Sequence, residues 1–106
     1  MEEIVCRDVF GNNIRLTSER WNHIVEEHPE VRSYQHCLDE ILKEPDSVKR
    51  SKKDRNVLLY YRYYPKMLGG KYLLAVAKIT FRSFLITFYI TDQIKGGEFI
   101  WRRRRG

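Results

Sequence analysis

The stretch Ser83-Phe-Leu-Ile-Thr-Phe-Tyr-Ile-Thr-Asp92 decides the fold, because its residues alternate with a period of two. That period is typical of an extended strand whose successive side chains point to opposite faces. One face of this strand collects four large apolar side chains: Phe84, Ile86, Phe88 and Ile90. The other face collects Ser83, Leu85, Thr87, Tyr89 and Thr91.

The preceding run, residues 71–80, alternates in the same way. If Phe81-Arg82 is a two-residue hairpin loop, Thr80 pairs with Ser83 and Lys78 pairs with Leu85. Four further apolar residues then join the Phe/Ile face, which we expect to be the core: Leu73, Ala75, Ala77 and Ile79. The opposite face carries Tyr72, Lys78, Thr80, Thr87, Tyr89 and Thr91.

Two more extended segments precede this pair, a short one around Val48 and a longer one at residues 57–64. Tyrosines are dense in the longer one, and its loop is too long to fix its register. A charged side chain is costly in a core, so we place Arg62 on the open face with the tyrosines.

Before Asp46 the apolar period is 3.6 instead of 2. A helix capped by Thr17 or Ser18 and ended by Pro29 is predicted, with one apolar stripe: Trp21, Ile24, Val25 and His28. A second helix is predicted from a cap at Ser33 to Pro45, and its apolar face consists of Tyr34, Cys37, Leu38, Ile41 and Leu42. A weak hairpin about Gly11-Asn12-Asn13 precedes both. The expected class is α+β, with an N-terminal hairpin and helices packed on one face of an antiparallel sheet.

Length and composition set the outer bounds. The 106 residues, 42% hydrophobic and 13% aromatic, predict one domain over 1–106 with a basic tail at 102–106. The N-terminus lacks the pattern of a signal peptide, and the longest apolar run is too short to span a bilayer. Cys6 and Cys37 match no metal-binding spacing and are expected to be reduced. A cytoplasmic protein with no membrane association is the prediction.

Charge is distributed unevenly along the chain. Residues 1–47 hold 5 basic and 11 acidic side chains, whereas residues 48–106 hold 15 and 3, for an overall net charge of +6. A basic, aromatic-rich sheet following an acidic helical half predicts a polyanionic ligand, and RNA is the expected partner. The alternatives are a solvated basic surface or a patch for an acidic protein.

Metal-independent RNA cleavage needs a base for the 2′-OH, an acid for the 5′-oxygen and cations for the phosphate. Histidine can fill either proton role near neutral pH, and either His23 or His28 is the predicted catalytic histidine. His23 can also be a surface residue in a local Arg–Glu network, and His28 can be a half-buried helix-end residue. His36 is expected to be exposed.

The rest of the predicted catalytic set lies on the strands: Arg62, Lys78, Thr87 and Thr91. The predicted RNA-binding residues are Arg20, Tyr61, Tyr89, Lys49, Arg50, Lys52 and Lys53. No ligand spacing indicates a metal site and no glycine-rich phosphate loop is present, so no metal and no cofactor are expected.

Taken in order, a set of short motifs resembles the phage-type barnase/EndoU/colicin/RelE-like (BECR-fold) nuclease domains over residues 4–101. The motifs are Leu16-Thr17, Arg20-Trp-Asn-His-Ile24, His28-Pro-Glu30, Glu44-Pro-Asp46, Leu59-Tyr-Tyr-Arg62, the strand from Tyr72 to Lys78, Thr87 with Thr91-Asp92, and Ile94-Lys-Gly-Gly97. The resemblance implies a small α+β RNase, with toxins of toxin–antitoxin or phage systems among its relatives. By position it assigns the site to His23 or His28, Arg62, Lys78 and Thr87 or Thr91, and it implies an acidic antitoxin as partner.

The chain departs from the barnase pattern because no strand glutamate is available as a base. After Asp54 the only acidic residues are Asp92 and Glu98. A RelE-like scheme, in which cations orient the RNA and perturb the 2′-OH, is therefore favoured. Two other functions use the same basic aromatic sheet, namely a non-catalytic RNA-binding module and a domain that docks an acidic regulator.

Overall fold

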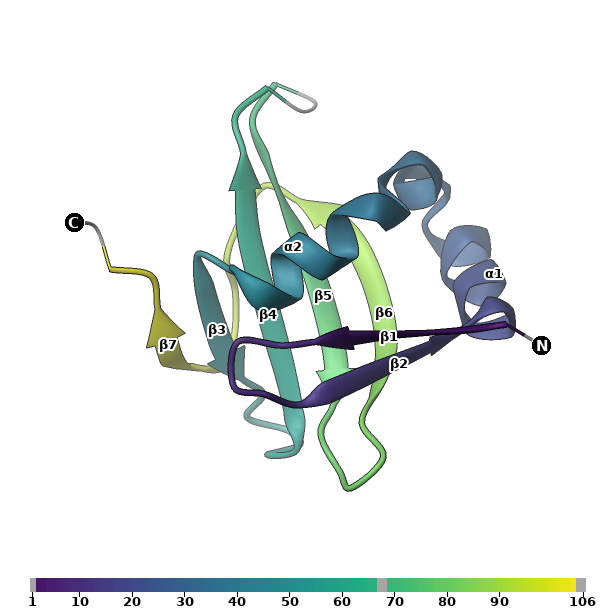
Figure 1. Cartoon of the computed structure of the whole chain (residues 1–106). Helices are drawn as coiled ribbons and strands as arrows, with labels where there is room; N and C mark the ends of the chain where they lie inside the picture. Colours follow the sequence, from purple (N-terminus) through teal and green to yellow (C-terminus); the bar gives the residue numbers. More distant parts are fainter. Residues whose placement is uncertain (1, 67–68, 105–106) are drawn as a thin grey trace.

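The computed structural model describes residues 2–66 and 69–104. A hairpin of β1 (Glu3–Arg7) and β2 (Asn13–Thr17) leads into α1 (Ser18–Glu27), the 3₁₀ helix η1 (Pro29–Cys37) and α2 (Leu38–Lys43). Five strands follow: β3 (Ser47–Arg50), β4 (Val57–Tyr64), β5 (Lys71–Lys78), β6 (Phe84–Thr91) and β7 (Glu98–Arg102). Figure 1 shows them as one strongly curved sheet, so the predicted α+β class is confirmed.

The strands lie in the order β1-β2-β6-β5-β4-β3-β7. All neighbouring pairs are antiparallel except β2 and β6, which run parallel and meet at Arg15 and Phe84. The sheet is therefore mixed, and the prediction of a purely antiparallel sheet was wrong at this junction. Strand β7, at the edge of the sheet, includes Arg102, which was predicted to belong to a basic tail.

The two α-helices take different places. Helix α2 covers β4 and β5, and the curled hairpin adds Ile14 and Leu16 to the same core. Helix α1 instead lies beside β6, where the Trp21 and Phe88 rings are 6.1 Å apart. Both helices still contribute to one core, because Ile24 of α1 is buried in the same cluster as Ile41 of α2 and Phe88 of β6. Helix α1 reaches this core at the edge of β6, which β2 meets at one residue pair.

The β5–β6 pairing differs from the predicted two-residue hairpin. Lys78 pairs with Phe84, and a bulge between Val76 and Ala77 shifts the register. Phe84 therefore turns to the face opposite the core, where it is 40% exposed, and Leu85 is buried in its place. Phe88 is buried and Ile90 packs on the core as predicted, whereas Thr80 lies in the turn, its N–H donating to Ser83 Oγ at 3.0 Å.

The helical half is confirmed at its start and corrected after it. Thr17 caps α1 by accepting a hydrogen bond from Arg20 N at 3.1 Å. The second segment does not begin at a Ser33 cap, because Ser33 lies inside η1 and the α-helical turns begin only at Leu38. Within the part of the chain that the structure covers, no helix is long and apolar enough to cross a membrane. Cys6 and Cys37 are buried free thiols.

A buried carboxylate joins the hairpin turn to the sheet. Asp8 is 5% exposed and accepts a hydrogen bond from the hydroxyl of the fully buried Tyr60, 2.5 Å away. It also accepts bonds from Phe10 N at 3.0 Å, Asn12 N at 2.7 Å and Asn12 Nδ2 at 3.0 Å. The turn of β1 and β2 is therefore fixed to β4 by charge-assisted hydrogen bonds.

Candidate nucleic-acid interface

The strand register arranges the side chains opposite α2 in rows across β4, β5 and β6, and this surface is here called the open face. One row holds Tyr63, Tyr72 and Thr91, and the next holds Tyr61, Leu74 and Tyr89. A third row holds Leu59, Val76 and Thr87. Adjacent rows lie about 7 Å apart along the strands. The predicted grouping of Tyr72, Thr87, Tyr89 and Thr91 on one face is confirmed.

Residues 92–97 form a roof over part of the open face. They must cross the sheet because β6 and β7 lie on opposite sides of β5, β4 and β3, and α2 already covers the other face. Tyr61 donates to the Lys95 carbonyl oxygen at 3.2 Å, and Lys49 Nζ donates to the Gly96 carbonyl oxygen at 2.6 Å. Burial under the roof raises the pKa of Tyr61. Tyr61 and Lys49 therefore hold the roof, and both are buried, at 2% and 9% exposure, where they were predicted to be accessible RNA contacts.

His28 lies at the rim of the open face. Its ring stacks on Tyr89, with centroids 4.8 Å apart and planes inclined by 20°. The chain turns out of α1 at this residue, whose N–H still donates to the Ile24 carbonyl oxygen at 2.7 Å before Pro29 redirects the backbone. Nδ1 is 3.6 Å from the Glu30 carboxylate. The stacked ring is thus half-exposed, with a carboxylate that can orient it.

His23 lies elsewhere. It is exposed on α1, and among the described residues it forms no hydrogen bond and no ion pair. Of the two histidines that the sequence left open, the structure brings only His28 to the sheet. His36 is exposed as predicted, with Nε2 3.5 Å from Cys37 Sγ.

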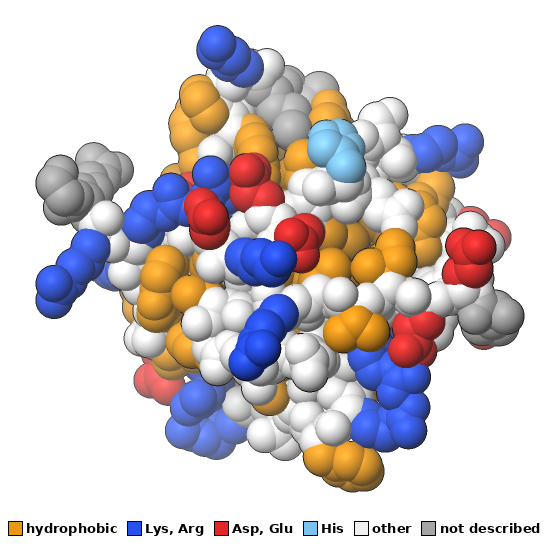
Figure 2. Space-filling model, viewed as in Figure 1, with side chains coloured by type: hydrophobic (Ala, Val, Ile, Leu, Met, Phe, Trp, Pro, Cys, Tyr) orange, Lys and Arg blue, Asp and Glu red, His pale blue; other side chains and the backbone are white. Residues whose placement is uncertain are grey.

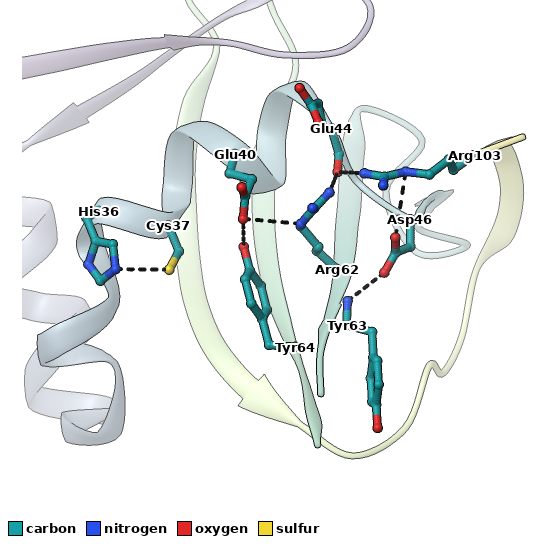
Figure 3. A network of polar contacts seen from close by, with 9 residues as sticks. All are labelled: His36, Cys37, Glu40, Glu44, Asp46, Arg62, Tyr63, Tyr64 and Arg103. Atoms are coloured by element: carbon teal, nitrogen blue, oxygen red, sulfur yellow. Dashed lines mark hydrogen bonds and ion pairs between the residues drawn. The ribbon is translucent and has the colours of Figure 1, made fainter. Parts of the chain in front are cut away.

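Arg62 points to the α2 side, not to the open face (Figure 3). Its Nε is 3.3 Å from Glu40 Oε1, and its Nη1 donates to the Glu44 carbonyl oxygen. The same Glu40 oxygen accepts a bond from Tyr64 OH at 2.6 Å, and burial raises the pKa of Tyr64. Our placement was wrong because the cost of a charge near the core is offset here by a carboxylate and by carbonyls freed at the end of α2.

Lys78 does lie on the open face, but at its other end. Its ammonium group forms an ion pair with Asp54, whose pKa this hydrogen bond lowers. Leu74 is paired with Tyr89. Lys78 and Leu74 are four residues apart on β5, a distance of about 14 Å. The predicted catalytic set is therefore not assembled as a unit: His28 stacks on Tyr89, Thr87 and Thr91 lie one row away on either side of it, and Arg62 and Lys78 are engaged elsewhere.

The remaining predicted RNA contacts are scattered. Lys52 and Lys53 are exposed in the β3–β4 connection, and Arg20 is exposed in the first turn of α1. Arg50 lies on the core side of β3 and lines a cavity with Leu58 and Ile79. Over α2, acidic and basic side chains lie close together (Figure 2), so that face carries no uniform positive patch.

A hollow beside the roof was missed by the sequence analysis. Its volume is about 800 Å³ and it is here called the arginine–aromatic hollow, with the lining Asp46, Ser47, Arg62, Tyr63, Tyr72, Ile94, Phe99, Arg102 and Arg103. The Arg102 guanidinium lies 3.8 Å from the centroid of Phe99, and the Tyr63 and Tyr72 rings are 5.2 Å apart. The run of aromatic and β-branched residues Phe99-Ile-Trp101 before the arginines was the signal that could have shown a strand here.

Among residues 2–66 and 69–104, no group of three or more His, Cys, Asp or Glu side chains is placed to hold a metal ion. Comparisons with protein-family models, curated proteins and solved structures found no match to this chain.

Proposed function

We propose that this protein is a metal-independent endoribonuclease that binds single-stranded RNA on its open face and uses His28 as its catalytic histidine. The observation that carries the proposal is the half-exposed His28 ring stacked on Tyr89, at the rim of a tyrosine-lined sheet. Imidazole can transfer a proton at neutral pH, and Glu30 lies 3.6 Å from Nδ1, where it can orient the ring.

The surroundings of His28 suit RNA. Tyr63 and Tyr72 offer aromatic faces in the row next to Tyr89, and bases stack on such rings without sequence preference. Arg102 brings positive charge to the arginine–aromatic hollow beside them, and Arg103 there lies 3.8 Å from the Asp46 carboxylate (Figure 3). His28 would move the proton of the 2′-OH or of the leaving 5′-oxygen, and the arginines, four strands away across the sheet, would hold other phosphates of the bound strand. The products would then be 2′,3′-cyclic phosphates.

The nuclease resemblance and a role as a toxin with an acidic antitoxin belong to the same proposal. Support for the toxin role is limited to the resemblance and the basic charge of residues 48–106. Growth of cells expressing wild type and His28→Ala side by side tests it, with arrest by wild type alone as the expected result.

The test of the activity itself is cleavage of a fluorescent single-stranded RNA and of the same sequence as DNA, in EDTA. Wild type should cut RNA and leave DNA intact. His28→Ala should lose about 10²–10⁴-fold in rate, the usual cost of removing a proton-transferring group. His23→Ala is the matched control and should cut like wild type. Equal activity of both variants, with melting temperatures unchanged, would exclude His28 as the catalytic group.

A second candidate is an RNA-binding module without catalysis. It is favoured by one observation: Arg62 and Lys78, the strand cations assigned to catalysis, are held by Glu40 and Asp54. Charge and stacking in the arginine–aromatic hollow suffice for binding. Wild type that binds RNA in a salt-dependent manner but never cuts it would establish this function instead, and absence of binding at low salt would exclude both.

A further inference from the structure

A second group of positive charge lies at the opposite end of β6 from His28. A cavity of about 290 Å³, here called the arginine cavity, is lined by Glu3, Arg15, Thr17, Arg20, Arg82, Phe84 and Leu85. Arg15 Nη2 is 2.5 Å from Glu3 Oε2, and this contact lowers the pKa of Glu3. Among the described residues, Arg20 and Arg82 form no ion pair. Three guanidinium groups against one carboxylate leave the cavity positive, as an anion site requires.

The fold gives this cavity a fixed distance from His28. Arg20 lies in the first turn of α1 and His28 follows its last residue, and the eight residues between them span about 12 Å. On the neighbouring strand, Phe84 and Tyr89 pair with Lys78 and Leu74, which are four residues apart on β5, about 14 Å. The two estimates agree because α1 lies beside β6 (Figure 1). A stacked strand advances about 3.4 Å per phosphate, so at most about four nucleotides bridge the two positions.

The surface between the two positions suits a nucleic-acid strand. Phe84 and Tyr89 present aromatic rings at its two ends, and Val76 and Thr87 lie between them without charge. Phe84 pairs with Arg15 across the parallel junction of β2 and β6, which places an aromatic side chain next to the arginines. Rings spaced along one strand beside cationic groups match alternating bases and phosphates better than they match an acidic polypeptide.

We propose that the arginine cavity binds a backbone phosphate of the same RNA strand whose scissile bond lies at His28, at most about four nucleotides away. This inference rests on the proposed RNA-cleaving function and adds a distant phosphate subsite to it. The enzyme would then prefer substrates that extend past the cleavage point far enough to reach Arg20 and Arg82.

The test compares binding of 2′-O-methyl oligouridylates of three and twelve nucleotides, measured by fluorescence anisotropy across a salt series. The variant is Arg20→Gln with Arg82→Gln, which leaves the Arg15–Glu3 pair in place. For the twelve-mer, the magnitude of the log–log salt slope should fall by about 0.7, the value for one lost phosphate contact on a single strand. The three-mer should bind as it does to wild type.

The control variant is Arg7→Gln with Arg55→Gln, which removes the same charge from two exposed positions outside the cavity. An equal effect of this control, or a twelve-mer slope unchanged in the arginine variant, would overturn the subsite while leaving RNA cleavage intact. Failure of wild type to bind or cut either length would overturn the proposed function itself. Displacement of the twelve-mer by a twelve-residue polyglutamate at lower concentration than by RNA would assign the cavity to an acidic protein instead.

Discussion

The hydrogen bond from Tyr60 to Asp8 offers a direct test of how the hairpin is held to the sheet. Tyr60→Phe removes one of four donors to a buried carboxylate and leaves the bonds from Phe10 and Asn12 in place. A hydrogen bond to a charged group contributes about 1.5–3 kcal/mol. The ring itself stays buried, so no cavity cost is added. The free energy of unfolding should fall by that amount, which corresponds to about 6–12 °C in Tm for a domain of this size.

Urea unfolding followed by the fluorescence of Trp21 and Trp101 measures the change, and the m value should stay constant. Tyr63→Phe is the matched control on the same strand: Tyr63 is 45% exposed, and its hydroxyl forms no hydrogen bond among the described residues. A Tyr60→Phe variant within about 0.5 kcal/mol of wild type, the range of surface substitutions, would refute the reasoning.

Three further predictions concern the roof, an ion pair and a thiol. Gly97→Ala should lower the free energy of unfolding in urea more than Gly96→Ala does. Both glycines have positive φ, which costs an alanine about 1–2 kcal/mol. Only at Gly97 would the added Cβ also lie 2.5 Å from a carbonyl oxygen of β3. Equal losses would show that the roof can shift. The hydrogen bond from Lys78 lowers the pKa of Asp54 below 3.8. The ion pair therefore stabilises the fold above that pH, and this stabilisation is lost as the pH falls through the lowered pKa. The difference in unfolding free energy between wild type and Asp54→Asn should vanish in acid. Burial raises the pKa of the Cys6 thiol, so iodoacetamide should alkylate it at neutral pH only after unfolding, and rapid labelling of the folded protein would contradict its burial.

The strands could be predicted well because alternation is strong where one face is buried. Both ends of β4 and the start of β5 agree with the prediction, and the residues of β6 differ only at the ends. The hairpin about Gly11 and the Thr17 cap were also accessible, since each depends on local chemistry. What alternation cannot show is a bulge, and the bulge at Val76 turned Phe84 out of the core.

Other errors arose from long-range contacts. Arg62 was placed by the cost of burying a charge, but Glu40 comes from a helix whose position on β4 no local pattern specifies. Tyr61 and Lys49 were expected to be accessible, and the roof that buries them exists only because β7 pairs with β3. The His28–Tyr89 contact likewise depends on where α1 lies, so the sequence could name two histidines without choosing between them.

Lys49 contributes a buried positive charge to the electrostatic potential of the open face, which the exposed basic residues do not. It is only 9% exposed, with Gly96 O at 2.6 Å and the Phe99 ring centroid at 4.6 Å, and no carboxylate among the described residues lies within ion-pair distance. Dipoles and a π system thus stabilise this cation where another protein would place an anion. Mobile ions screen a charge in such a position poorly. The attraction of this face for a polyanion should therefore have a component that persists at high ionic strength, and counting phosphate contacts from a salt slope will miss it.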